Sequence, residues 1–161
     1  MFLREESVQI EGSSVVFTDE KLKTDEFVVI FKWRNVYQEL KEDENLHTLV
    51  DLPIGRLSLK VTGNNKGQIV LETGAKQIEF KKEIANLKSW SYIVVSLGEG
   101  KVVAEVQKSV DVYDWTVDDS APSQAIALHG EQVYGEFSDL QFFDEYFTMN
   151  QLTLMCVNIS A

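Results

Sequence analysis

Hydrophobic and polar positions alternate with a period of two along most of the chain, which is typical of strands with one buried and one solvent-facing side. In the segment 57–62, Leu57, Leu59 and Val61 are separated by polar residues. The segment 27–33 is largely apolar on both sides, which predicts a central strand buried on both faces. The same pattern predicts further strands at 92–97, 102–107, 8–10, 15–17, 48–52, 68–72, 77–80, 125–129, 135–143 and 152–159.

Short turns that contain glycine or asparagine separate these segments, as hairpins require. They occur at 63–67, 73–75 and 98–100. The most helix-like stretch, 37–45, has its acidic residues in a row and only a thin apolar face, so we interpret it as an exposed loop or one short turn. Many strands spaced by such turns predict an all-β, antiparallel two-sheet sandwich. No linker or repeat divides the chain, so we expect a single domain over residues 1–161.

The apolar sides of these segments predict the core. Residues on the inward side of each period-two run should pack between the two sheets of a sandwich. We expect eight large side chains to be buried there: Phe31, Trp33, Leu59, Trp90, Ile93, Val95, Leu128 and Phe142.

The charge is unevenly distributed along the chain. The net charge is −11, from 15 basic and 26 acidic side chains. All the lysines and arginines lie between Arg4 and Lys108, whereas residues 109–161 contain acids and no lysine or arginine. Such a segment would repel phosphate backbones and anionic lipids, which disfavours nucleic acid and membrane partners. We expect a protein partner with a basic surface, or a hard cation; a solvated face that aids solubility is the simpler alternative.

The composition also bears on the compartment. One cysteine, Cys156, cannot form an internal disulfide. No apolar run reaches the roughly 18 residues needed to span a bilayer. The N-terminal residues turn acidic at once and contain no signal-peptide core. We therefore expect a cytoplasmic location, and secretion only if a signal peptide was removed before Met1.

Several segments, in order, resemble a known superfamily. They are Val8–Phe17, Glu26–Trp33, Trp90–Ser96 with Gly100-Lys101-Val102, Ile126–Gly130, and Tyr134–Phe143. This order is similar to that of the concanavalin A-like superfamily, in particular its laminin-G-like branch. The resemblance implies a jelly-roll sandwich and relatives that bind or hydrolyse carbohydrate or hold calcium at the sandwich rim. The chain departs from the pattern at Glu136, where extracellular laminin-G modules often have a cysteine.

The sequence does not indicate an enzyme. Retaining glycosidases need two carboxyl groups about 5 Å apart. Glu136 and Asp139 are three residues apart on a predicted strand, so we expect their side chains on opposite faces, and the adjacent pair Asp144 and Glu145 has the same problem. Cys156 lies in an apolar strand, and His129 is best interpreted as a hydrogen-bonded residue at the sandwich rim. No nucleophile elbow, phosphate-binding loop or zinc spacing occurs.

Two binding sites can be suggested in the acidic segment. Asp118 and Asp119 supply the oxygens that calcium prefers, although a solvated acidic loop is the alternative. Aromatic side chains with polar neighbours can bind glycans, and Tyr113, Trp115 and Tyr134 are the candidates. The same residues could contact a protein partner.

We therefore expect a non-catalytic interaction or assembly module that binds another protein, as part of a larger complex. The alternative is a lectin-like module that binds a neutral carbohydrate with the assistance of calcium. No other cofactor is expected. The single cysteine and the missing metal and sugar signatures favour the first hypothesis.

Overall fold

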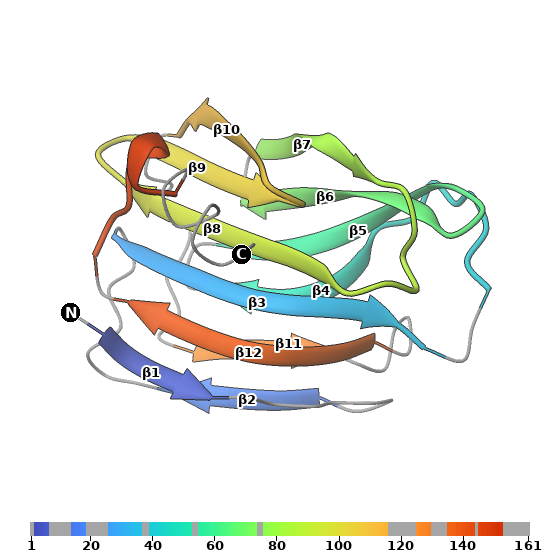
Figure 1. Ribbon diagram of the computed structural model, residues 1–161, viewed down its shortest axis with the longest axis horizontal. Coiled ribbons are helices and arrows are strands. Elements are labelled where there is room, and N and C mark those ends of the chain that lie inside the picture. Colours follow the sequence, from blue (N-terminus) through green and yellow to red (C-terminus); the bar gives the residue numbers. More distant parts are fainter. Residues whose placement is uncertain are drawn as a thin grey trace.

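The chain folds into two antiparallel β-sheets packed face to face (Figure 1). The computed structural model describes residues 2–6, 14–18, 26–36, 39–52, 55–73, 76–115, 125–129, 135–143 and 145–152. The strands in this part of the chain are β1 (Phe2–Glu6), β2 (Ser14–Thr18), β3 (Phe27–Asn35), β4 (His47–Leu52), β5 (Gly55–Gly63), β6 (Lys66–Thr73), β7 (Lys76–Ile84), β8 (Ser91–Gly98), β9 (Lys101–Val106), β10 (Ser109–Asp114), β11 (Ala125–His129) and β12 (Gly135–Phe143).

Among the described residues, each sheet has six strands. The first sheet has the order β1-β12-β3-β8-β9-β10, and the second has the order β2-β11-β4-β5-β6-β7. Strands from the two ends of the chain are neighbours, because β1 pairs with β12 and β2 pairs with β11. The predicted all-β, two-sheet jelly-roll sandwich is confirmed. Strand β3 lies between β12 and β8, as expected of a central strand.

The core lies between the two sheets and follows the alternation of the strands. On β3 the side chains of Phe27, Val29, Phe31 and Trp33 are all fully buried there. Seven of the eight predicted core residues belong to it, namely Phe31, Trp33, Leu59, Ile93, Val95, Leu128 and Phe142.

The prediction for Trp90 is wrong, because its side chain is only half-buried. Trp90 directly precedes β8 and lies three residues from Ile93, whose side chain points into the core. Positions an odd number of residues apart along a strand face opposite sides of the sheet. Trp90 therefore lies on the outer face with Tyr92. The spacing of Trp90 and Ile93 in the sequence is sufficient to predict this.

A second apolar cluster lies on the outer face of the first sheet. Its buried residues are Val28, Ile30, Val94, Val103 and Leu152. Residues 145–152, here called the C-terminal strap, cover it: Tyr146 and Phe147 pack against the cluster. The hydroxyl of Ser96 donates a hydrogen bond to the carbonyl oxygen of Phe147 and accepts one from its amide, both at 2.7 Å. The strap therefore covers part of this face.

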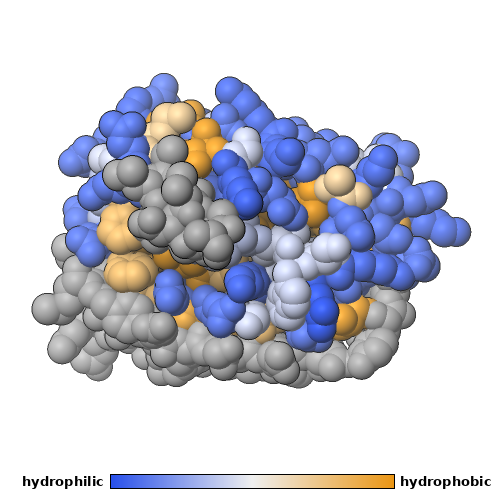
Figure 2. Space-filling model, in the orientation of Figure 1, coloured by the Kyte–Doolittle hydropathy of each residue, from blue (hydrophilic) through white to orange (hydrophobic). Residues whose placement is uncertain are grey.

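On the face shown in Figure 2, the described residues are mainly hydrophilic, and hydrophobic residues show in several small areas. Within the part of the chain that the structure describes, no helix is long and apolar enough to span a bilayer. Residues 39–46, which join β3 and β4, contain no helix, in agreement with the loop predicted for their region.

Candidate functional site

Tyr113, a predicted binding residue, joins the two sheets at one margin of the sandwich. Its ring stacks on Phe80 of β7 at a centroid distance of 5.6 Å. Its hydroxyl accepts a hydrogen bond of 2.9 Å from the backbone amide of Lys81. Burial raises the pKa of Tyr113 above its ordinary value. The ring and the hydroxyl are thus both engaged within the molecule.

The structure buries Trp115, the second predicted aromatic residue. Only 4% of it is exposed, and it belongs to the core between the sheets. Its amide donates a hydrogen bond of 2.9 Å to the carbonyl oxygen of Gly100. Asp118, Asp119 and Tyr134 lie outside the described residues. The calcium site and the aromatic platform therefore stay predictions, and among the described residues no three His, Cys, Asp or Glu side chains gather as a metal site.

Folding disperses the acids of the last third of the chain. Asp111 and Asp114 lie on β10 at one margin of the first sheet, whereas Glu136 and Asp139 lie on β12, with β3, β8 and β9 between. Each has a basic partner from earlier in the chain: Asp111 with Lys81 at 3.9 Å, Asp114 with Lys101, Glu136 with Arg34 at 2.8 Å, and Asp139 with Lys32 at 3.2 Å. The segregation of acids and bases along the sequence is therefore not kept in space for these four acids, because each lies beside a lysine or an arginine.

A bulge in β12 brings Glu136 and Asp139 to the same face of the sheet. The pairing of β12 with β3 shifts between Ser138 and Gln141, and Asp139 has a φ of 55°. Both carboxylates form ion pairs with bases that lie two residues apart, and therefore on one face, on β3: Lys32 and Arg34. The prediction that Glu136 and Asp139 face opposite sides is therefore wrong, because an extra residue in a bulge reverses the alternation.

These side chains belong to a polar and aromatic surface on the outer face of the first sheet. The guanidinium carbon of Arg34 lies 4.4 Å from the ring centre of Trp90, in a cation–π contact. Its Nη2 donates a hydrogen bond of 2.8 Å to Glu136, whose side chain is 12% exposed. Tyr92 lies opposite Lys32 in the pairing of β3 with β8. We call this surface the Trp90 patch: Lys32, Arg34, Trp90, Tyr92, Glu136 and Asp139.

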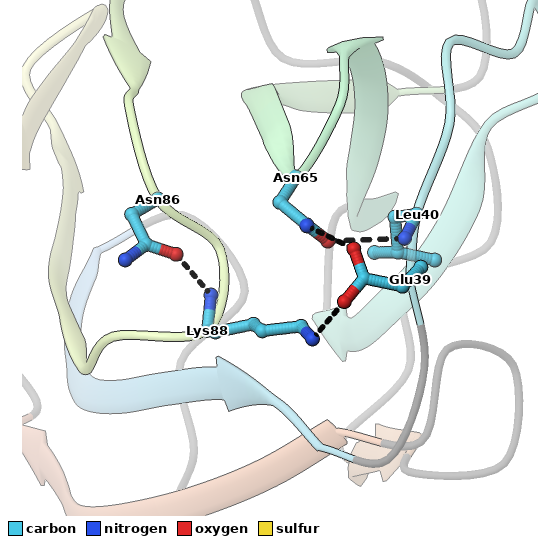
Figure 3. A network of polar contacts seen from close by, with 5 residues as sticks. All are labelled: Glu39, Leu40, Asn65, Asn86 and Lys88. Atoms are coloured by element: carbon cyan, nitrogen blue, oxygen red, sulfur yellow. Dashed lines mark hydrogen bonds and ion pairs between the residues drawn. The ribbon is translucent and has the colours of Figure 1, made fainter.

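A network of hydrogen bonds fixes the loop that precedes Trp90 (Figure 3). Lys88 lies two residues before Trp90, and its ammonium group forms an ion pair with the carboxylate of Glu39. Asn65 donates to the same carboxylate at 2.6 Å and accepts from the amide of Leu40 at 3.0 Å. The Asn86 side chain accepts a hydrogen bond of 3.0 Å from the amide of Lys88. The hydrogen bonds from Lys88 and Asn65 hold the pKa of Glu39 below its usual value.

Backbone hydrogen bonds join the same loops. The amide of Leu87 donates to the carbonyl oxygen of Asn65, and the amide of Asn35 donates to the carbonyl oxygen of Leu87, both at 2.8 Å. Asn35 is the last residue of β3, directly after Arg34. The loop is thus fastened to the strand that carries Arg34, and the Trp90 patch stands on a preorganised part of the molecule.

The Trp90 patch is not predicted by the sequence. The sequence pattern predicts Trp90 in the core, and nothing in a single sequence indicates that Arg34 makes a cation–π contact with it. The available signal is the alternation from Trp90 to Tyr92, which places two aromatic residues on the face opposite Ile93.

Comparison with solved structures shows similarity in fold to botulinum neurotoxin binding domains. The chain is 14% identical to the serotype G binding domain, with a TM-score of 0.64, covering 100% of this chain and 45% of that one. It is 11% identical to the serotype D binding domain, also with a TM-score of 0.64, covering 96% and 42%. The serotype DC binding domain in complex with rat synaptotagmin II is 13% identical, with a TM-score of 0.60, covering 96% and 43%.

This chain therefore spans less than half the length of the solved domains it matches. Identities this low establish the shared fold alone. No family model matches the sequence, and no curated protein matches it either.

Proposed function

We propose that this chain is a non-catalytic binding module that recognises another protein through the Trp90 patch. The observation that carries the proposal is the cation–π contact of Arg34 with Trp90 on the outer face of the first sheet, where Arg34 also donates a hydrogen bond to Glu136. Tryptophan, tyrosine and arginine are the residues that most often dominate the binding energy of protein interfaces. Here all three occur together, and a half-buried tryptophan still has surface to offer a partner.

The net charge of the whole molecule indicates the charge of the partner's surface. A net charge of −11 favours association with a protein whose surface is basic, since opposite potentials steer the encounter. The proposal includes a cytoplasmic location, because a single cysteine cannot form the internal disulfides that are common in secreted domains. The similar serotype DC domain was solved in complex with synaptotagmin II, and this supports a binding role for the shared fold.

A protein partner is preferred to a carbohydrate on the basis of the aromatic residues. Tyr113 is engaged with Phe80 and Lys81, and Trp115 is buried. Sugars bind aromatic side chains through an open ring face, and Arg34 occupies one face of Trp90. Glu136 and Asp139 each form an ion pair with a base on β3. These ion pairs give both carboxylates a structural role, so no catalytic role is needed to explain them.

The test is affinity capture with the full chain as bait. Wild type and Trp90→Ala are immobilised, incubated with an extract of the source cell, and the retained proteins are quantified by mass spectrometry. A native partner should be lost from Trp90→Ala and kept by Val112→Ala, a control at an exposed position on β10 of the same sheet. Equal retention of every protein by wild type and Trp90→Ala would refute the proposed site, once both variants are shown to be folded.

A further inference from the structure

We propose that the segment which binds the Trp90 patch is an uncharged peptide segment: an aromatic or aliphatic side chain next to a hydrogen-bond acceptor, such as a main-chain carbonyl or a carboxamide. This inference rests on the proposed function and names the part of the partner that fits the site. It is separate from the basic surface that the overall charge of the molecule favours.

The charges of the patch cancel locally. Its two bases, Lys32 and Arg34, lie on β3, and its two acids, Glu136 and Asp139, lie on β12 in ion pairs with them. A charged group placed on the patch would be attracted by one member of each pair and repelled by the other. Interfaces pair complementary potentials, so the complement of a locally neutral patch is an uncharged segment.

Arg34 provides the polar contact. Its Nη2 donates a hydrogen bond to Glu136, and its guanidinium carbon lies over the Trp90 ring. Among the described residues Arg34 makes no other polar contact, so its Nη1 donors have no acceptor there. A guanidinium that is already oriented loses little entropy when it binds an acceptor. Since Glu136 neutralises its charge, a neutral carbonyl oxygen is a sufficient acceptor.

Trp90 and Tyr92 provide the apolar contact. They lie two residues apart on the same face, about 6.6 Å along the chain for an extended strand. Tyr92 also packs against the apolar cluster below the C-terminal strap, and it is half-buried there. An aromatic or aliphatic side chain beside these rings would be removed from water on binding, at about 25 cal/mol for each Å² of apolar surface.

Peptide display on phage tests this inference even while the native partner is unidentified. A random heptapeptide library is selected on the wild-type chain after depletion on Trp90→Ala. The selected peptides should contain an aromatic or large aliphatic residue and carry little net charge. Synthetic versions should bind wild type and Val112→Ala equally and Trp90→Ala about tenfold more weakly, since 1.4 kcal/mol corresponds to tenfold.

Two further measurements complete the test. Arg34→Lys keeps the charge but loses the planar group, and it should weaken the same peptides several-fold. The affinity should change less than about twofold between 50 and 500 mM NaCl, because no net charge is neutralised on binding.

Three results would overturn the inference: selected peptides rich in lysine and arginine with strongly salt-dependent binding, no peptide that depends on Trp90, or neutral oligosaccharides that shift the Trp90 indole signal in NMR spectra. If the selected peptides are basic but the captured partner still requires Trp90, only the inference of an uncharged segment fails, and the proposed function stands. If the captured proteins are also indifferent to Trp90→Ala, the proposed function fails as well.

Discussion

Trp33 and Trp90 show how far the position of one residue along a strand decides its contribution. Trp33 is fully buried between the sheets, and the Cα of Gly135 lies against its indole: a Cβ built on Gly135 would be 2.2 Å from Nε1. Trp90 is half-buried on the outer face under Arg34. A tryptophan side chain therefore packs in the core at position 33 and makes a partly exposed contact at position 90.

Truncating the two tryptophans should separate these roles. Trp33→Ala should cost about 3–5 kcal/mol of unfolding free energy, the range for large buried aromatics. Trp90→Ala should cost about 1–2 kcal/mol, since only part of the ring and one cation–π contact are lost. Urea unfolding of both variants measures the difference, and equal costs would mean that Trp90 is a core residue after all.

Glu39 supplies a pH-dependent contact at the residue scale. Its folded pKa lies below its ordinary value, so the stabilisation that its carboxylate gives the folded state is present above the unfolded pKa and is lost as the pH falls through the folded pKa. The Asn65 side-chain amide signals should therefore shift in NMR spectra as the pH falls through the lowered pKa of Glu39. Glu39→Gln should remove this transition, whereas Glu79→Gln, at an exposed acid of β7, should leave it unchanged.

At the scale of elements, the C-terminal strap depends on a close approach at Gly98. A Cβ built on Gly98 would lie 2.5 Å from the Cβ of Tyr146, whereas one on Gly63 would meet only the Lys66 side chain at 3.7 Å. Gly98→Ala should thus push the strap outward and speed amide hydrogen exchange at Phe147, whose amide is bound by Ser96. Gly63→Ala is the matched control, and an identical exchange rate in both variants would contradict this role of Gly98.

Alternation and turn residues are sufficient to predict the sandwich and most of its core, because both depend on local sequence. The bulge at Asp139 and the pairing of β12 with β3 are not predictable in this way, because register is set by contacts between residues about a hundred positions apart. For the same reason the linear segregation of charge is misleading. Lysines of β7 and β9 reach the acids of β10 only in the folded chain.

At the scale of the whole molecule, the two sheets meet at the margin formed by β7 and β10. Both are terminal strands of their sheets, and such edges present unpaired backbone groups. The hydroxyl of Tyr113 accepts the hydrogen bond of one of these groups, the amide of Lys81. Lys76 donates to the carbonyl oxygen of Asp114 at 3.4 Å, and Lys81 pairs with Asp111. This margin is thus closed by side chains of both sheets.

Removing the Tyr113 hydroxyl should weaken this closure without disturbing the core. Tyr113→Phe keeps the stack on Phe80 but leaves the amide of Lys81 without its acceptor, which should cost about 1 kcal/mol and speed exchange of that amide. Tyr113→Ala loses the stack as well and should cost more. The freed amide also makes the edge of β7 available to a second copy, so light scattering should detect more self-association in Tyr113→Phe than in wild type. Unchanged exchange at Lys81 would show that the margin is closed by other contacts.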